Sequence, residues 1–488
     1  MKIIILSLLI VVLSLPGTSA QESPKDHGFY AINENVLKAQ VNFLASEWTE
    51  GRETGERGAW LSADYIASML QLYGVVPGGD YSSSGRTYFQ QFNLMKTSPG
   101  EKQEFSLIST GKNGKRTVEF AYQTDFMVTP SEPSGVLEAP VVFVGYGYRD
   151  KEKGWDDFSK KDIEGKFILR IAGLPPSLRN EEDRAASFRS AAAKDEIAMS
   201  LGAVGIIEVD PSGNVESRWF EQKDFFNMST SERGSSRPRV RYSIPGENIN
   251  QNIPRVSVTV RAANAILAPS GITVMDFVAG KAASGDKGEL PANLIVLSTS
   301  VKTSLVRVRN VVGYIEGKNR NEVIVLGAHY DHLGLRDGYI YNGADDNASG
   351  TAAVLTLAKA ISAAGVQPEK SIIFALWTGE EKGLLGSRYY TDYPTVPEEN
   401  IKMNLNFDMI SRYLKDETPD AVTMTYTDTH PLFRKITEEN ILKYGIKLDV
   451  DYQPSDNPPG GSDHRSFVAK GIPVMRFKPG HRAEYHTP

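Results

Sequence analysis

The sequence contains no cysteine at all, and only seven of its 488 residues are histidine. The absence of cysteine excludes disulfide bonds and thiolate metal sites, so any bound metal must be held by histidine, aspartate and glutamate. These ligand types favour zinc, manganese or a similar ion. An excess of positive charge is also absent, because the net charge is -6, and this argues against nucleic acid as a partner. No internal repeat is visible, and the length predicts two or three domains.

The N-terminal segment carries an apolar run that is too short to span a bilayer comfortably, since a span needs about 20 residues. Lys2 provides a positive start, Ile3 to Leu15 are apolar or small, and Thr18-Ser19-Ala20 has the form of a cleavage site. This pattern predicts a signal peptide over residues 1–20. We therefore expect an exported protein, periplasmic or secreted, with no membrane span after its removal. A retained membrane anchor is the alternative.

Three regions that differ in the spacing of their apolar residues follow the predicted signal peptide. Apolar residues at three- and four-residue spacing predict helices within residues 36–73, which are interrupted by a loop. Short strand-like runs with little titratable chemistry predict an inserted β-rich domain over 112–300. Strands alternate with helices over 301–488, which predicts an α/β fold with a mostly parallel sheet covered by helices on both faces. Residues 21–111 are interpreted as the N-terminal part of that same α/β domain.

In the last region, apolar runs that predict buried strands are followed closely by acidic or histidine side chains, and six of the seven histidines come after residue 328. The side chains are His329 and Asp331, Asp345 and Asp346, Glu380 and Glu381, Asp408 and, on two later segments, His464 and His486. Parallel strands place their carboxyl ends at one edge of a sheet, where ligands bind in open α/β folds. Carboxylates gathered there repel each other unless cations lie between them. Two metal ions about 3.5–4 Å apart with a shared carboxylate fit this pattern.

The adjacent pair Glu380-Glu381 suggests a division of labour. If both side chains bound metal, no base would remain, whereas one ligand and one free carboxylate allow a metal-activated water to lose its proton. Asp331 lies two residues after His329, and side chains two apart on an extended chain share a face. We therefore expect Asp331 to hold the other imidazole nitrogen of His329 and to fix its tautomer.

Six segments together resemble a known family. GAHYDHLG, NGADDNASG, WTGEEKGLLGSRYY, NLNFDM, GGSDHRSF and EYHTP occur in the order found in the co-catalytic zinc aminopeptidases and glutamate carboxypeptidases of peptidase clan MH, which include bacterial leucyl aminopeptidases. The resemblance covers the segment EGRETG and nearly all of residues 305–488. VVFVGYGY and GWDDFSKKDIEGKFIL in the middle region resemble the protease-associated (PA) domain that is inserted in many members.

The resemblance implies a role for each matched residue. It implies that His329 and Asp408 bind one zinc ion, that Glu381 and His486 bind the other, and that Asp346 bridges the two. Manganese or cobalt would accept the same ligands.

The resemblance further implies that Glu380 is the general base for a metal-bridged hydroxide and that the Asp346–Asn347 peptide bond is cis. His464 would line the substrate site or lie behind the ligands. The family usually continues beyond His486 with an aspartate and a terminal helix, whereas this sequence stops at Pro488. We therefore expect either a truncated sequence or a weak second metal.

The expected function is hydrolysis of N-terminal peptide bonds by an exported di-zinc aminopeptidase acting on peptide substrates. A carboxypeptidase or dipeptidase of the same fold is the main alternative, and its arginine cluster could come from Arg388, Arg412, Arg465 and Arg476. There are two further alternatives. One is a single-zinc acyltransferase similar to glutaminyl cyclase, and the other is a non-catalytic binding protein on a peptidase scaffold, similar to the transferrin receptor. We expect His332 to be a rim or structural histidine. Oligomeric state is left open.

Overall fold

The computed structural model describes residues 24–111, 114–129, 135–150, 154–178, 193–211, 240–246, 253–281, 289–336, 338–480 and 484–488. The predicted signal peptide lies outside the described residues, so it stays a prediction. None of the helices in the described part of the chain combines the length and apolar character needed to cross a membrane.

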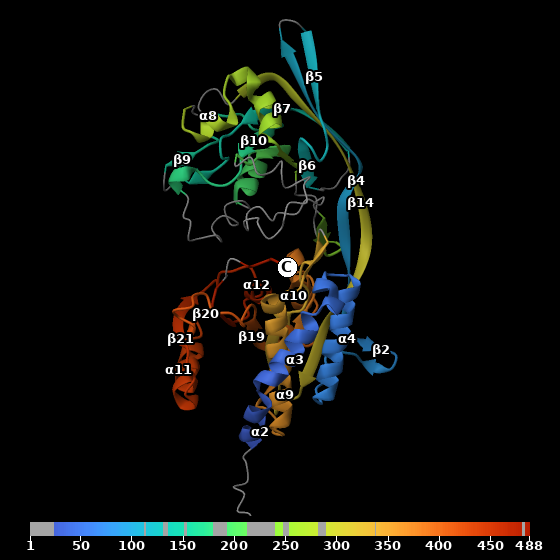
Figure 1. Ribbon diagram of the computed structural model, residues 1–488, viewed down its shortest axis with the longest axis vertical. Coiled ribbons are helices and arrows are strands. Elements are labelled where there is room, and N and C mark those ends of the chain that lie inside the picture. Colours follow the sequence, from blue (N-terminus) through green and yellow to red (C-terminus); the bar gives the residue numbers. More distant parts are fainter. Residues whose placement is uncertain are drawn as a thin grey trace, which may run out of the picture.

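The structure is elongated and consists of two parts joined by two long strands (Figure 1). The helices are α2 (Pro24–Ala31), α3 (Glu34–Leu44), α4 (Arg57–Leu72), a helix over 193–200, α7 (Val260–Leu267), α8 (Val274–Val278), α9 (Gly350–Ala363), α10 (Leu385–Asp392), α11 (Leu432–Tyr444) and α12 (His464–Val468). The strands of the large sheet are β1 (Val76–Pro77), β4 (Phe89–Gly111), β5 (Gly114–Phe120), β6 (Phe126–Thr129), β7 (Gly135–Phe143), β10 (Phe167–Ile171), β11 (Gly205–Val209), β12 (Arg241–Ser243), β13 (Arg255–Val258), β14 (Glu289–Ile315), β15 (Asn319–His329), β18 (Lys370–Trp377), β19 (Ile401–Phe407), β20 (Ala421–Thr427), β21 (Asp449–Ser455) and β22 (Val474–Lys478). Three small hairpins complete the set: β2 (Tyr81–Ser82) with β3 (Gly85–Arg86), β8 (Arg149–Asp150) with β9 (Trp155–Asp156), and β16 (Gly334–Arg336) with β17 (Tyr339–Tyr341).

The lower part of Figure 1 contains the mixed, mostly parallel sheet that the sequence predicts. Strand β15 lies between β18 and β19 and is parallel to both, and β19 is parallel to β22. Strands β14 and β20 run antiparallel to their neighbours β18 and β22. The carboxyl ends of β15, β18 and β19 therefore lie together at one edge.

Helices cover both faces of this sheet because side chains on its central strands alternate between two apolar cores. On β18, Phe374 and Leu376 pack with the buried faces of α4 and α9. Ile373 and Trp377 point the other way and pack against Tyr390 of α10 and residues of α12. Along a parallel strand buried on both faces, an almost continuous apolar run is the expected pattern.

The upper part is β-rich, as the sequence predicts. Strands β7, β10, β11 and β13 are parallel, β6 closes one side, and α7 and α8 pack against the apolar face. The long antiparallel pair β4 and β14 belongs to both parts, with pairing from Phe89–Val311 to Ser109–Asn293. The boundaries at 112 and 300 and the PA identity stay predictions.

Candidate metal centre

The predicted site residues occupy the edge where the parallel strands end. His329 is the last residue of β15. Glu380 and Glu381 follow β18 after a short turn, and Asp408 follows the last residue of β19 directly. Because the three strands are neighbours and parallel, these side chains come together although 79 residues separate the first from the last. The side chains that follow the strand ends therefore lie close together, as expected from the sequence.

Asp346 reaches the same edge from the turn that precedes α9. Its peptide bond to Asn347 is cis, as the resemblance implies. The Asn347 side chain donates a hydrogen bond to the carbonyl of Phe407 (2.9 Å) and accepts one from the backbone N–H of Gly350 (2.9 Å). These contacts tie the turn to the end of β19 and to the start of the helix, so the Asp346 carboxylate has a fixed position.

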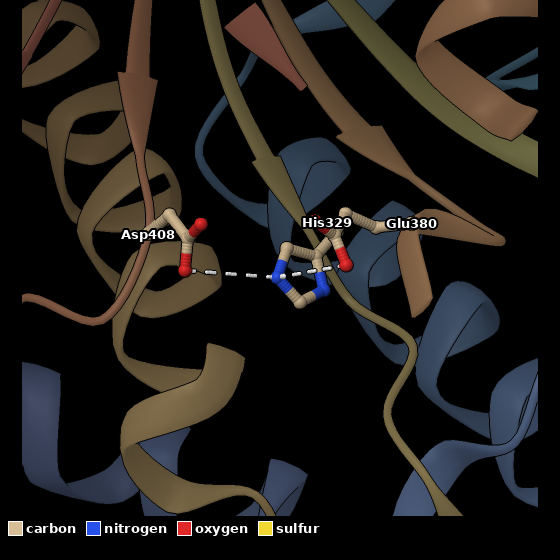
Figure 2. Close-up of side chains that lie close together, drawn as sticks. All are labelled: His329, Glu380 and Asp408. Carbon is tan, nitrogen blue, oxygen red and sulfur yellow. Dashed lines mark ion pairs between the residues drawn. The ribbon is translucent and has the colours of Figure 1, made fainter. Parts of the chain in front are cut away.

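The first cluster surrounds His329 (Figure 2). Its Nε2 lies 3.3 Å from Asp346 Oδ1, 3.8 Å from Asp408 Oδ1 and 4.0 Å from Glu380 Oε2. Ligand atoms of a tetrahedral zinc ion with bonds of about 2.0 Å are separated by roughly 3.3 Å. The histidine and the two aspartates approach that spacing, whereas the Glu380 carboxylate lies farther out.

The second cluster uses the other oxygen of Asp346. His486 Nε2 lies 3.2 Å from Asp346 Oδ2 and 3.4 Å from Glu381 Oε2. These separations again match the edge of a tetrahedral zinc site. Asp346 thus presents one oxygen to each cluster. Glu380 lies at the first cluster, where its carboxylate converges with His329 and Asp408 closely enough to share a metal ion, and within the described residues His332, Asp346 and Glu381 converge in the same way.

The donor sets fit metal ions for a second reason. Within the described residues, Asp408 Oδ1 and His486 Nε2 have no hydrogen-bond partner. Buried polar atoms normally find partners, and a carboxylate with only 6% of its residue exposed is costly to leave without one. Oxygen and nitrogen donors converging in this way suit zinc, and manganese or cobalt as well.

Burial and neighbouring charges push the two adjacent glutamates in opposite directions. Burial raises the pKa of Glu380 well above its usual value, and the charge of Glu381 adds to this against the opposing effect of His329. Burial also raises the pKa of Glu381, but the hydrogen bond from His332 and the nearby His486 outweigh it and hold the pKa well below its usual value. Two carboxyl groups whose pKa values are driven apart are typical of groups with different proton-transfer roles.

Asp331 is fully buried and holds the site through several contacts. Its backbone carbonyl, rather than its carboxylate, is the nearer partner of the imidazole: His329 Nδ1 lies 3.1 Å from the carbonyl oxygen and 3.8 Å from Oδ1. Donation from Nδ1 leaves the Nε2 lone pair free for a metal. The carboxylate instead accepts hydrogen bonds from the Thr54 hydroxyl (2.8 Å) and the Glu380 backbone N–H (3.1 Å).

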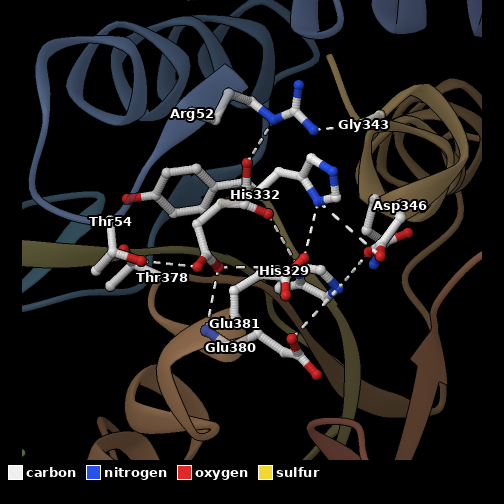
Figure 3. Close-up of polar contacts among 12 residues, drawn as sticks. Arg52, Thr54, His329, His332, Gly343, Asp346, Thr378, Glu380 and Glu381 are labelled. Carbon is white, nitrogen blue, oxygen red and sulfur yellow. Dashed lines mark hydrogen bonds and ion pairs between the residues drawn. The ribbon is translucent and has the colours of Figure 1, made fainter. Parts of the chain in front are cut away.

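Three further residues lie at the site and were not assigned to it from the sequence (Figure 3). Arg52 is fully buried behind it, Thr54 contacts Asp331, and His332 contacts Glu381 at 2.8 Å. The segment EGRETG was noticed only through the resemblance, which gave Arg52 and Thr54 no role. Tyr485 adjoins His486, and its ring stacks on that imidazole at 3.7 Å between centroids.

His464, Asp345 and His430 lie apart from the two clusters, and His481 lies outside the described residues. His464 is buried, and its Nε2 contacts the Pro459 carbonyl at 3.1 Å. Asp345 accepts hydrogen bonds from the backbone and the hydroxyl of Ser411. His430 is exposed and lies 3.1 Å from the Thr429 hydroxyl.

Comparison with known proteins finds a matching sequence family for the C-terminal part of the chain. Residues 310–488 match the sequence family described as Peptidase family M28. The leupeptin-inactivating enzyme 1 of Streptomyces exfoliatus is 33% identical over 201 residues, which are 41% of this chain and 41% of that protein. Leucine aminopeptidase 2 of Arthroderma otae is 33% identical over 167 residues, which are 34% of this chain and 32% of that protein. The chain matches less than half the length of these curated relatives.

The fold also has a solved counterpart. The structure of an aminopeptidase from Aneurinibacillus sp. strain AM-1 superposes with a TM-score of 0.53 at 19% identity, and the match covers 95% of this chain and 89% of that chain. At this identity the likeness concerns the fold alone. It confirms the predicted α/β architecture with a mixed sheet between helices.

Proposed function

We propose that this chain, whose residues 310–488 match Peptidase family M28, is an aminopeptidase that hydrolyses N-terminal peptide bonds at a two-zinc centre. The observation that carries this proposal is the division of the buried acids. Asp346 presents one oxygen to each of two nitrogen-and-oxygen donor sets, and Glu380, which converges with His329 and Asp408, is the acid that we assign to proton transfer.

The metal ligands are assigned from these donor sets. His329 and Asp408 would hold one zinc ion, Glu381 and His486 would hold the other, and Asp346 would bridge them. When bound, such ions polarise a carbonyl and lower the pKa of a bound water towards about 7.

Glu380 is the group that moves the proton. Its carboxylate accepts a proton from the attacking water as the oxygen–carbon bond forms, and passes it to the amine nitrogen as the carbon–nitrogen bond breaks. The raised pKa in its buried setting suits a base that must also release the proton as an acid. Asp331 supports both neighbours, because its carboxylate holds the Glu380 backbone N–H and its carbonyl orients His329.

Aminopeptidase activity is favoured over carboxypeptidase activity by two considerations. The relative from Arthroderma otae is described as a leucine aminopeptidase. A carboxypeptidase also needs arginine to bind the substrate's terminal carboxylate, and two of the four candidate arginines have other partners. Arg465 donates a hydrogen bond to Asn457, and Arg412 lies 3.5 Å from Glu484.

The test combines metal analysis with a substrate panel. We expect purified full-length protein to contain about two zinc ions per chain and to release the N-terminal residue of free peptides and aminoacyl anilides. N-acetylation of the substrate should abolish the reaction, and a chelator should abolish it reversibly. Hydrolysis of N-blocked peptides from the carboxyl end would replace the proposal with the carboxypeptidase alternative. A single zinc ion with cyclase activity would replace it with the acyltransferase alternative.

We also propose that the protein is exported and that residues 112–300 form an inserted PA domain. Export is supported by the pattern of residues 1–20, and N-terminal sequencing that returned Met1 from the exported fraction would contradict removal of a signal peptide. The PA assignment of 112–300 is supported by the motifs in that region and by its separate apolar core. Limited proteolysis that released no stable fragment near these boundaries would count against an independent domain.

A further inference from the structure

The two oxygens of Glu381 have different surroundings, and the contact with His332 is drawn in Figure 3. Oε2 faces the second donor set and lies 3.4 Å from His486 Nε2. Oε1 faces His332 and lies 2.8 Å from its Nδ1. One oxygen of the carboxylate therefore faces the proposed metal site, and the other faces the His332 imidazole. His332 has no role in the reaction derived above.

The distances indicate what His332 does there. A separation of 2.8 Å is that of a charge-assisted hydrogen bond and is shorter than the roughly 3.3 Å expected between two ligand atoms of one tetrahedral zinc ion. The same Nδ1 lies 3.9 Å from Asp346 Oδ2, which is longer than that spacing. His332 therefore fits as a donor to a ligand better than as a ligand itself.

The imidazole is held in place from several sides. Its side chain is only 2% exposed, and its backbone N–H donates a hydrogen bond to the Arg52 carbonyl at 3.1 Å. Gly343 adopts a positive φ of 56°, and a Cβ atom there would lie 2.5 Å from the ring. The Arg52 guanidinium donates in turn to the carbonyl of Gly343 (2.8 Å), so the wall behind the imidazole is fixed as well. Such packing leaves His332 little freedom to follow Glu381 if that side chain moves.

We propose that His332 is a positioning residue that donates its Nδ1–H to Glu381 Oε1 and so presents Oε2 alone to the second metal ion. This inference rests on the two-zinc centre proposed above. Partners of this kind hold a ligand in one orientation, and their removal typically weakens metal binding by about 10–100-fold. Because the first donor set does not include Glu381, the effect should be confined to the second ion.

The experiment measures zinc affinity rather than activity. Metal-free full-length protein is titrated with zinc against a fluorescent chelator, and both stepwise dissociation constants are determined for wild type and for H332A, H332N and H332Q. Asparagine places its amide N–H close to the position of Nδ1, whereas glutamine places it near Nε2, away from Glu381. We expect H332A and H332Q to weaken one of the two steps by about 10–100-fold and to leave the other unchanged. H332N should recover most of the loss.

His430 offers a matched control, because it is exposed and lies outside both clusters. H430A should bind both ions as wild type does. If H332A fails to fold, judged by circular dichroism, the comparison of H332N with H332Q carries the test alone.

Three results would overturn the inference. Unchanged affinity in both steps in H332A or H332Q would show that the hydrogen bond does not position Glu381. X-ray absorption showing one imidazole fewer around zinc in H332N than in wild type would make His332 a ligand instead. Wild type that binds only one zinc ion would remove the proposed two-metal function itself, and this outcome is distinguishable because it precedes any comparison of variants.

Discussion

Replacing each of the adjacent glutamates with glutamine should separate catalysis from metal binding. The two side chains leave the same turn, and glutamine preserves the size of each, so the substitutions differ only in which carboxylate loses its charge. Glu381 Oε2 lies in the second donor set, 3.4 Å from His486 Nε2. Glu380 Oε2 lies 4.0 Å from His329 Nε2, and this carboxylate is proposed as the base rather than as a ligand. E380Q should therefore keep both zinc ions and E381Q should lose one.

The expected loss in E380Q follows from the role of a general base. Such a group contributes about 10²–10⁴-fold to turnover, which corresponds to roughly 3–5 kcal/mol in the activation free energy. The zinc content is measured by elemental analysis after gel filtration, and kcat is measured with a saturating aminoacyl anilide at a fixed excess of zinc. Added zinc should restore part of the activity of E381Q and none of that of E380Q.

The assignment has a clear refutation. If E380Q turned over substrate at the wild-type rate, Glu380 could not be the proton carrier. If E380Q lost a zinc ion while E381Q kept both, the roles of the two residues would be exchanged.

Three further predictions concern stability. T54V should lower the free energy of unfolding by about 1–3 kcal/mol in denaturant titrations, because the buried Asp331 carboxylate loses a hydrogen bond of 2.8 Å, and T54S should retain most of it. Burial lowers the pKa of His464 to about 3, so the unfolded chain binds an extra proton below about pH 6.5, and wild type should lose about 1.4 kcal/mol per pH unit on acidification towards pH 3. H464Q, which keeps a donor for the Pro459 carbonyl, should lack this part of the slope when both proteins are measured in chelator. Zinc at about 100 times its dissociation constant should stabilise the folded protein by about 2.7 kcal/mol, seen as a raised melting temperature that a chelator reverses; an unchanged melting temperature would contradict a structural contribution of the metals.

The meeting of the candidate site residues could be predicted from the sequence because parallel strands end at the same edge of a sheet. Once β15, β18 and β19 are placed side by side, His329 and Asp408 must lie at the same edge, and the residues just after β18 must join them. The alternation of apolar side chains within each strand is a local property, and it is visible in the sequence.

The contacts of His332 and Asp331 could not be predicted in the same way. The contacts of His332 depend on the loop around Gly343 and on Arg52, which lies 280 residues before it in the sequence, and those of Asp331 involve the similarly distant Thr54. Spacing along β15 indicated correctly that Asp331 lies near His329, but the nearer atom is the backbone carbonyl. No side-chain pattern distinguishes these two partners.

Several elements at the periphery were missed for a different reason. The long strands β4 and β14 contain Pro99-Gly100 and the polar run Ser298–Ser300, which interrupt the alternation expected of a strand. Helix α11 has no buried residue, and β20 and β21 lie beside it at the edge of the sheet. Elements with little buried apolar surface give weak periodic signals, whereas the central strands give strong ones.

Arg52 shows why the site needs the N-terminal segment as well as the part matched by the family. The matched residues 310–488 contain every proposed ligand, yet Arg52 is the fully buried cation behind them. Its guanidinium donates to the carbonyls of Leu44, Tyr330, Asn342 and Gly343 and so fixes the segments that carry His332 and Asp346.

Burial lowers the pKa of Arg52 to about 10, while the charges of Asp346, Asp331 and Glu381 oppose that shift. Arg52 therefore contributes positive charge near the acids, but its hydrogen-bond donors are directed at backbone carbonyls. It forms its hydrogen bonds with those carbonyls, whereas the imidazoles of His329, His332 and His486 lie directly against the carboxylates. The N-terminal segment therefore fixes the geometry of the strand ends, and the opposite charge that a cluster of acids needs must come from groups in contact with it, which are the imidazoles and the metal ions proposed above.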